Sequence, residues 1–135
     1  MSLYKAYNQY KQNSIFTSSP EELTLMLYNG LVKFIMQAQK AIDDKDIQKA
    51  HESIIRSQEI LREFQASLDM KYPISQSLML LYDYMHRRLL DANVKKNNDI
   101  LEEVLEFAKE LRDTWTQAMK LAKQQQPRQV EQIAK

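Results

Sequence analysis

The chain has 135 residues, the size of one domain, and its 19 basic and 18 acidic residues leave a net charge of +1. This balance argues against a nucleic-acid-binding protein, and the lack of cysteine excludes disulfides, thiol nucleophiles and thiolate metal sites. The N-terminus lacks the apolar core of a signal peptide, and the longest apolar run, Leu78 to Tyr82, is too short for membrane insertion, so we expect a cytosolic protein.

The low glycine content favours an all-α fold. The chain contains one glycine and three prolines, whereas sheets need tight turns that draw on glycine. Leu, Lys, Glu, Gln, Met and Ala are abundant, and these residues favour helices.

The first two predicted helices begin at recognisable caps. In residues 19–43, Ser19 is a suitable N-cap, Pro20 takes the first helical position and Glu22 completes a capping box. A polar turn follows, and Asp46 is placed to cap the second helix, residues 46–70.

Two further helices complete the predicted domain. Pro73 interrupts the helical pattern, and the third helix then covers residues 74–96. The fourth, residues 98–123, has apolar residues three and four apart. Each helix is about 24 residues or 36 Å long, and short connections favour antiparallel neighbours. The sequence therefore predicts an antiparallel up-down four-helix bundle over residues 19–123, a flexible N-terminal segment at 1–18 and a disordered polar tail at 124–135.

The first and third helices carry more apolar residues than one buried face requires. Large apolar patches are rare on the surfaces of monomers, so this excess predicts a partner-binding groove. Seven methionines and seven tyrosines suit such a surface, because they grip amphipathic helices well. The alternative is ordinary core packing, with the N-terminal segment covering part of these helices.

Motifs for catalysis, metal or cofactor binding are weak. The Asp83-x-x-His86 pair has no second copy, as a di-iron bundle would require. No haem-attachment motif or glycine-rich phosphate loop is present. His51 and His86 lack the neighbours typical of phosphorylated histidines, although a histidine phosphotransfer module remains a rival hypothesis. We therefore expect a non-enzymatic protein. A helix-binding adaptor or a regulatory bundle fits the sequence better than the phosphotransfer module does.

Four phrases together resemble the flagellar secretion chaperone family FliS. They are AYNQYKQN (6–13), SPEELTLMLYNGLVKFI (19–35), LYDYMHRRLLDAN (81–93) and LRDTW (111–115). They follow the order and spacing of the family, and the similarity covers about residues 3–122.

This resemblance implies a cytoplasmic export chaperone. Such proteins hold the C-terminal amphipathic segment of flagellin, prevent its premature polymerisation and deliver it to the flagellar type III export apparatus. The resemblance also implies that the N-terminal segment covers the groove when no client is bound, with Leu3, Tyr7 and Tyr10 as its apolar contacts.

Within this family we predict that the partner-binding groove combines apolar and basic residues. The apolar or aromatic candidates are Tyr28, Ile55, Met79, Tyr82, Tyr84 and Met85. The candidates for its polar rim are Arg87 and Arg112.

Overall fold

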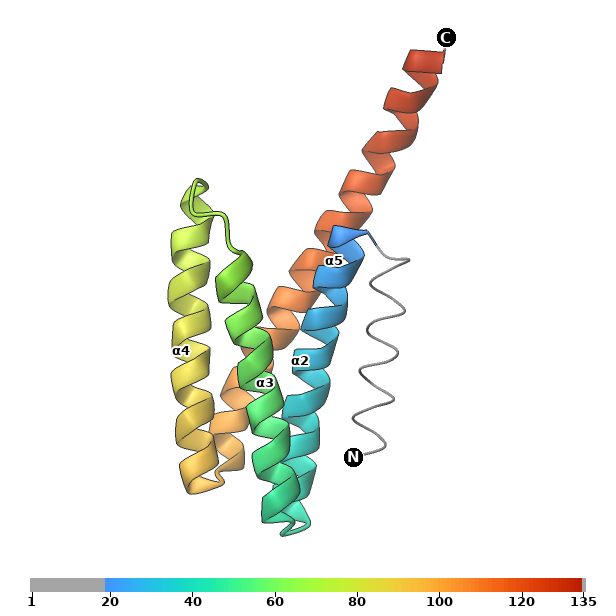
Figure 1. The fold of residues 1–135 in the computed structure, drawn as a ribbon. Coiled ribbons are helices and arrows are strands. Elements are labelled where there is room, and N and C mark those ends of the chain that lie inside the picture. The colour runs from blue at the N-terminus through green and yellow to red at the C-terminus, as the bar shows by residue number, and fades with distance from the viewer. Residues whose placement is uncertain (1–18, 135) are drawn as a thin grey trace.

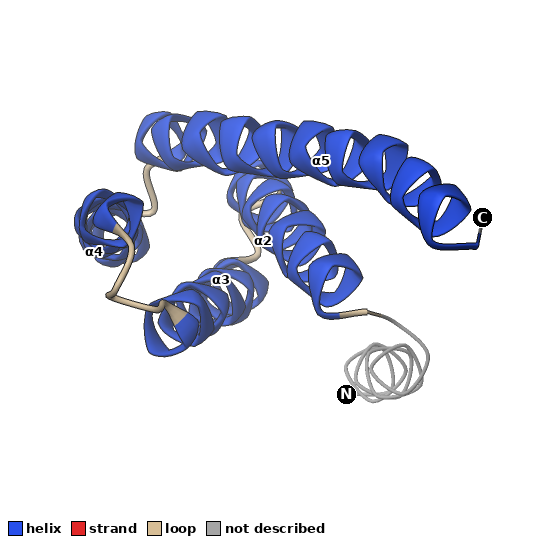
Figure 2. Ribbon diagram, turned by 90° about the horizontal axis from the view of Figure 1, so that it is seen from above, coloured by secondary structure: helices blue, strands red, loops and turns tan. Residues whose placement is uncertain are grey.

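The described part of the chain is an all-α four-helix bundle, as predicted. The computed structural model describes the backbone of residues 19–134 and the side chains of residues 19–125. Its helices are α2 (Pro20–Asp43), α3 (Ile47–Ser67), α4 (Pro73–Lys95) and α5 (Asn98–Ala134). Consecutive helices run in opposite directions (Figure 1). Helix α2 packs against α3 and α5, and α4 packs against the same two helices from the other side (Figure 2).

The helix starts follow the predicted signals. The Ser19 hydroxyl accepts a hydrogen bond from the Glu22 backbone N–H at 3.2 Å, and the Asp46 carboxylate accepts one from the Lys49 N–H at 3.1 Å. These caps satisfy backbone donors that have no partner within the helix. Lys45 and Lys96 take left-handed conformations at helix ends, with φ of 61° and 50°, in positions that glycine usually occupies.

The core lies between the four helices and consists mainly of aliphatic side chains. Its fully buried members come from every helix, so the core joins all four elements. They include Leu31 and Ile35 of α2, Ile54 and Leu61 of α3, Met85 and Leu89 of α4, and Leu101 and Val104 of α5.

Helix α3 is shorter than the predicted range. It ends at Ser67, and Leu68 is extended. The Asp69 carboxylate accepts the Lys71 N–H at 3.0 Å, and the Asp69 carbonyl accepts the Ser75 hydroxyl at 2.6 Å. Such local side-chain bonds stabilise a turn in competition with another helical turn.

Helix α5 is longer than predicted. The sequence predicted a helix ending at residue 123 and a disordered tail, whereas the backbone is helical to Ala134. The stretch before Pro127 is rich in Gln, Lys and Ala, which are good helix formers. Pro127 removes one backbone donor from α5, and the backbone stays helical on both sides of it.

Candidate functional site

Three of the predicted groove residues lie in the core. Tyr28, Tyr82 and Met85 are at most 5% exposed. The two tyrosine hydroxyls form a hydrogen bond of 2.8 Å, and both rings stack on Phe64, with centroid distances of 4.4 and 5.4 Å. These three side chains therefore cannot contact a partner in this conformation, and their assignment to a surface groove needs correction. Tyr28 and Tyr82 were predicted to line the groove, but inside the core each hydroxyl is the hydrogen-bond partner of the other.

Burial also changes the chemistry of the tyrosine pair. Loss of solvation raises the pKa of both phenols. The hydrogen bond from one hydroxyl to the other raises the pKa of Tyr82 further and opposes the rise at Tyr28. Both hydroxyls stay protonated at physiological pH, so the pair is a neutral structural contact across the bundle.

Tyr84 lies at the contact between α4 and α5. Its hydroxyl donates to both carboxylate oxygens of Glu103, at 3.1 and 3.0 Å, and its ring meets Phe107 edge-on at 6.2 Å. Arg88 Nε donates to the same carboxylate at 2.9 Å. The hydrogen bond to Glu103 raises the pKa of Tyr84 and that of Arg88. Glu103 therefore ties α4 to α5 at this level of the bundle.

Beyond this contact, α5 leans away from α4 (Figure 1). Leu78 and Leu81 of α4, and Phe107 and Leu111 of α5, pack against the core but are only partly buried. Leu121, further along α5, is 61% exposed. We define the α4–α5 seam as the surface formed by Leu78, Leu81, Tyr84, Phe107, Leu111 and Leu121.

Trp115 fixes α5 at the start of α2. Its indole N–H donates to the Glu21 backbone carbonyl at 2.9 Å. Since α2 begins at Pro20, α5 extends past the end of its neighbour from this point on. Phe107, Leu111, Ala118 and Leu121 recur at helical spacing, so one face of α5 stays apolar where the bundle no longer covers it.

The remaining predicted residues lie on separate faces. Ile55 and Met79 are half-buried; Met79 shares a face of α4 with Asn93, whose amide lies 3.0 Å from His51 of α3. Arg87 is exposed on α4, pairs with Asp83 at 3.5 Å and lies over the Tyr84 ring, 6.0 Å from its centroid.

Arg112 is half-buried on α5 and pairs with Asp113 at 3.0 Å. Of the predicted groove set, the structure thus brings Tyr84 into the α4–α5 seam and Arg87 beside it. The predicted lid residues Leu3, Tyr7 and Tyr10 lie outside the described residues.

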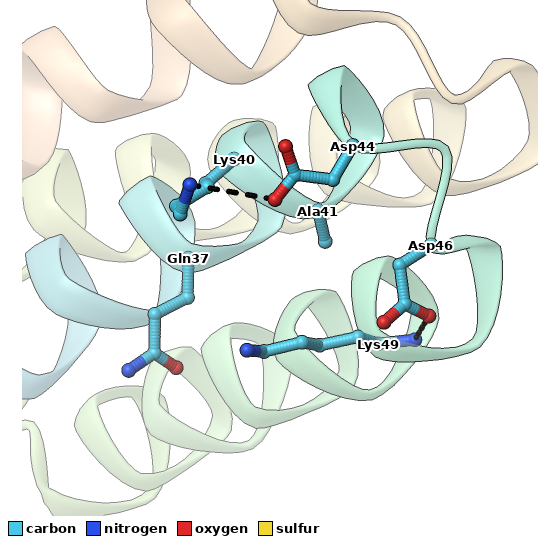
Figure 3. A pocket seen from close by; sticks show the side chains of 6 residues that line it. All are labelled: Gln37, Lys40, Ala41, Asp44, Asp46 and Lys49. Atoms are coloured by element: carbon cyan, nitrogen blue, oxygen red, sulfur yellow. Dashed lines mark hydrogen bonds and ion pairs between the residues drawn. The ribbon is translucent and has the colours of Figure 1, made fainter.

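A small polar pocket of about 90 Å³ lies at the turn between α2 and α3 (Figure 3). Two of its carboxylates already have structural partners. Asp44 pairs with Lys40 at 3.4 Å, and Asp46 caps α3. The pocket is therefore part of a charged helix connection, at the opposite end of α2 from Trp115.

The two histidines occupy different environments. His51 is exposed and contacts Asn93. His86 is half-buried, and its burial, together with the nearby Arg62, lowers its pKa; Asp83 has the opposite, smaller effect.

Among residues 19–125, no group of three His, Asp or Glu side chains is placed to hold a metal ion. None of the described helices is both long and apolar enough to cross a membrane.

Sequence reasoning did not single out Phe107, Leu111 or Leu121 as surface residues. The sequence feature that could have identified them is the helical spacing of apolar residues along α5, which continues beyond the point where α2 begins. A helix of 37 residues beside one of 24 residues must leave part of its apolar face uncovered.

Comparisons with known proteins agree with this architecture. The model of the family "Flagellar protein FliS" matches residues 3–122. The chain is 42% identical to the flagellar secretion chaperone FliS of Bacillus subtilis over 119 residues, which cover 88% of this chain and 90% of the relative. It is 33% identical to that of Campylobacter jejuni, over 82% of this chain and 88% of the relative.

A solved structure of a bacterial flagellar chaperone has a similar fold. Its TM-score is 0.70 at 20% identity, and the match covers 87% of this chain and 97% of that structure. The chain therefore belongs to the FliS family of flagellar secretion chaperones, which are not enzymes.

Proposed function

We propose that this chain is a cytoplasmic export chaperone for flagellin. It binds the C-terminal amphipathic segment of flagellin, prevents its premature polymerisation and delivers it to the flagellar type III export apparatus. Family membership supports the chaperone role. The observation that carries the binding role is the α4–α5 seam, an apolar surface left uncovered among the described residues.

The seam is suited to a client helix. From Phe107 to Leu121 its face on α5 extends over about 21 Å, enough for about four turns of a docked helix. An amphipathic helix binds such a surface through apolar residues at spacings of three and four. Burying those residues occludes the face through which flagellin segments would otherwise associate with one another.

The polar contacts at one end of the seam limit where a client can lie. Arg88 and the Tyr84 hydroxyl both donate to the Glu103 carboxylate, and an apolar side chain placed on these groups would remove their remaining water without offering a new hydrogen bond. The client helix therefore lies toward the open end, beside Leu81, Leu111 and Leu121.

The N-terminal segment is the proposed cover of the client-binding surface in the absence of flagellin. The chain enters α2 at Pro20, next to Trp115 and the open end of the seam. Residues 1–18 are attached at this end, where a covering segment has to begin. Competition between this segment and flagellin would keep the apolar surface protected and make client release easier.

Calorimetric titration tests the proposed function. The full chain is titrated with the C-terminal segment of flagellin, and with the N-terminal segment as the control. We expect one-to-one binding of the C-terminal segment alone, with a negative heat-capacity change because apolar surface is buried. Absence of binding, or equal binding of both segments, contradicts the proposal.

A further inference from the structure

The register of α3 against α4 places Gln58 opposite His86. The two helices are antiparallel neighbours, and the His51 ring of α3 contacts the Asn93 amide of α4 at 3.0 Å. Seven residues make nearly two full turns, so residues seven apart lie on almost the same face of a helix. One such step along each helix from this contact leads to Gln58 on α3 and to His86 on α4. These two side chains therefore share the next level of the same contact.

Two observations support this register. Phe64 of α3 stacks on Tyr82 of α4 at 5.4 Å, which bounds the level of Gln58 and His86 from the other side. Arg62 follows Gln58 by one turn on the same face of α3, and its charge acts on His86. His86 itself is half-buried, as expected for a ring held between two helices.

Gln58 carries a hydrogen-bond donor that the bundle leaves without a partner. Gln58 is 7% exposed, and its Nε2 has no hydrogen-bond partner among the described residues. A buried N–H group without a partner is destabilising. Neutral imidazole has one ring nitrogen that accepts a hydrogen bond, whereas the charged ring has none. A small rotation of the facing side chains lets Gln58 donate to a neutral His86, so the buried amide favours the neutral ring.

The charged groups around His86 also favour the neutral ring. Arg62 faces it from α3, whereas the acidic neighbour on α4, Asp83, already pairs with Arg87 at 3.5 Å. The α5 carboxylate that contacts α4, Glu103, lies on the other side of α4. Burial and Arg62 lower the pKa of His86, and Asp83 opposes them with a smaller effect.

We propose that Gln58, Arg62 and His86 form a pH-sensitive latch between α3 and α4. With a neutral ring, Gln58 donates to His86 and the two helices stay packed. A protonated ring presents N–H groups on both nitrogens to a donor and a cation of α3. Inverting the Gln58 amide offers the charged ring an oxygen but leaves the repulsion by Arg62. Protonation therefore separates α4 from α3 at this level, because separation gives the charged ring water.

The direction of the pH effect follows from proton linkage. In the closed latch the pKa of His86 lies below 6.5, and in the open latch the solvated ring returns to its ordinary pKa of 6.5. The open form therefore binds the proton first, and its population rises as pH falls below 6.5. Each unit by which the closed-state pKa lies below 6.5 corresponds to about a tenfold rise in opening at low pH.

The latch acts on one side of the α4–α5 seam. Leu78 and Leu81 belong to α4, so movement of α4 away from α3 changes the apolar surface that the seam presents. This consequence rests on the proposed function: affinity for the C-terminal segment of flagellin should fall as pH drops below 6.5. The latch itself requires no client and is tested without one.

NMR and amide hydrogen exchange on the full chain test the latch. A pH titration of the His86 ring should give a pKa below 6.5. Amide protection is compared at about pH 7.5 and about pH 5, each relative to the intrinsic exchange rate at that pH. Helix α4 stands at the edge of the bundle (Figure 2), and a helix without its packing partner is marginal in water. Protection in α4 should therefore fall at the lower pH by more than protection in α2 and α5.

Three variants identify the groups of the latch. Gln58→Glu has the same size but offers an acceptor to the charged ring, so the pKa of His86 should rise above 6.5 and the loss of protection at low pH should disappear. Arg62→Gln should raise the pKa of His86 and reduce the loss. Arg56→Gln is the matched control: this arginine lies on another face of α3, pairs with Glu59 at 3.1 Å, and should change neither quantity. Circular dichroism confirms that each variant is folded.

Four outcomes overturn the proposal. The first is a pKa of His86 at or above 6.5 in the natural chain. The second is α4 protection that is the same at both pH values. The third is an equal loss of protection in all four helices, which would show that His86 affects only overall stability. The fourth is a pKa of His86 that Gln58→Glu leaves unchanged, because the two side chains would then not face each other. None of these measurements involves flagellin, so their result is independent of the proposed chaperone function.

Discussion

The hydrogen bond between the Tyr28 and Tyr82 hydroxyls predicts strong coupling between two substitutions. Both side chains are buried, the oxygens are 2.8 Å apart, and Phe64 stacks on both rings. Tyr28→Phe or Tyr82→Phe keeps the ring and its stacking but removes one hydroxyl. The hydroxyl that remains is then buried beside a hydrocarbon ring, with neither its former partner nor water.

The expected magnitudes follow from that arrangement. Leaving one buried hydroxyl unpaired should lower the free energy of unfolding by about 1–3 kcal/mol in each single variant. The double variant removes both polar groups at once, so it should be destabilised by less than the sum of the two single effects. The double-mutant cycle should give a coupling free energy of about 1–2 kcal/mol.

Urea unfolding followed by circular dichroism measures these free energies, and equal m-values in all four proteins are the control for unchanged unfolded states. Single variants as stable as the natural chain would refute the reasoning, since the hydroxyls would then not depend on each other. Strictly additive single effects would refute it equally, because additivity means that the two groups do not interact.

Three further predictions concern other parts of the bundle. Trp115→Phe removes the indole hydrogen bond to α2, so it should lower the free energy of unfolding by about 1 kcal/mol and speed amide hydrogen exchange in the first turn of α2. Amide exchange in that turn as slow as in the natural chain would contradict this prediction. Burial and Arg62 lower the pKa of His86 below 6.5, so the unfolded state binds this proton first, and stability should fall as pH drops below that value. His86→Gln should reduce the loss of stability below pH 6.5 and leave the stability well above pH 6.5 nearly unchanged. An equally steep loss of stability in this variant would show that His86 does not cause it. Deleting residues 2–17 should change the affinity for flagellin and expose apolar surface to a fluorescent dye, and no change in either would exclude the covering role.

The helix starts could be predicted from sequence because their causes are local. Ser19 and Asp46 each bond to a backbone N–H three residues later, so the pattern and the contact lie within one turn. The end of α5 was harder to predict. A single Pro127 suggested a break, whereas helix length depends on the summed preferences of many residues on either side of it.

The site could be predicted only in part, because burial depends on distant partners. The sequence marked Tyr28 and Tyr82 as tyrosines on helices, but only the fold brings these hydroxyls together across 54 positions of the chain. The uncovered part of α5 also depends on a distant partner. Leu121 is exposed because α2 begins beside Trp115 and does not extend along α5 as far as Leu121. Exposure of this kind is a property of the assembled bundle.

The most direct test of the proposed client site compares two exposed leucines in one titration with the C-terminal segment of flagellin. Leu121 lies on the α4–α5 seam and is 61% exposed, whereas Leu80 lies on the outward face of α4 and is 72% exposed. Full burial of a leucine contributes about 1.5–3 kcal/mol, so covering the exposed part of Leu121 contributes about 1–2 kcal/mol. Leu121→Ser should therefore weaken binding by about 5- to 30-fold, while Leu80→Ser leaves it unchanged. Unchanged affinity for Leu121→Ser, or a loss at least as large for Leu80→Ser, would contradict binding of flagellin at the seam.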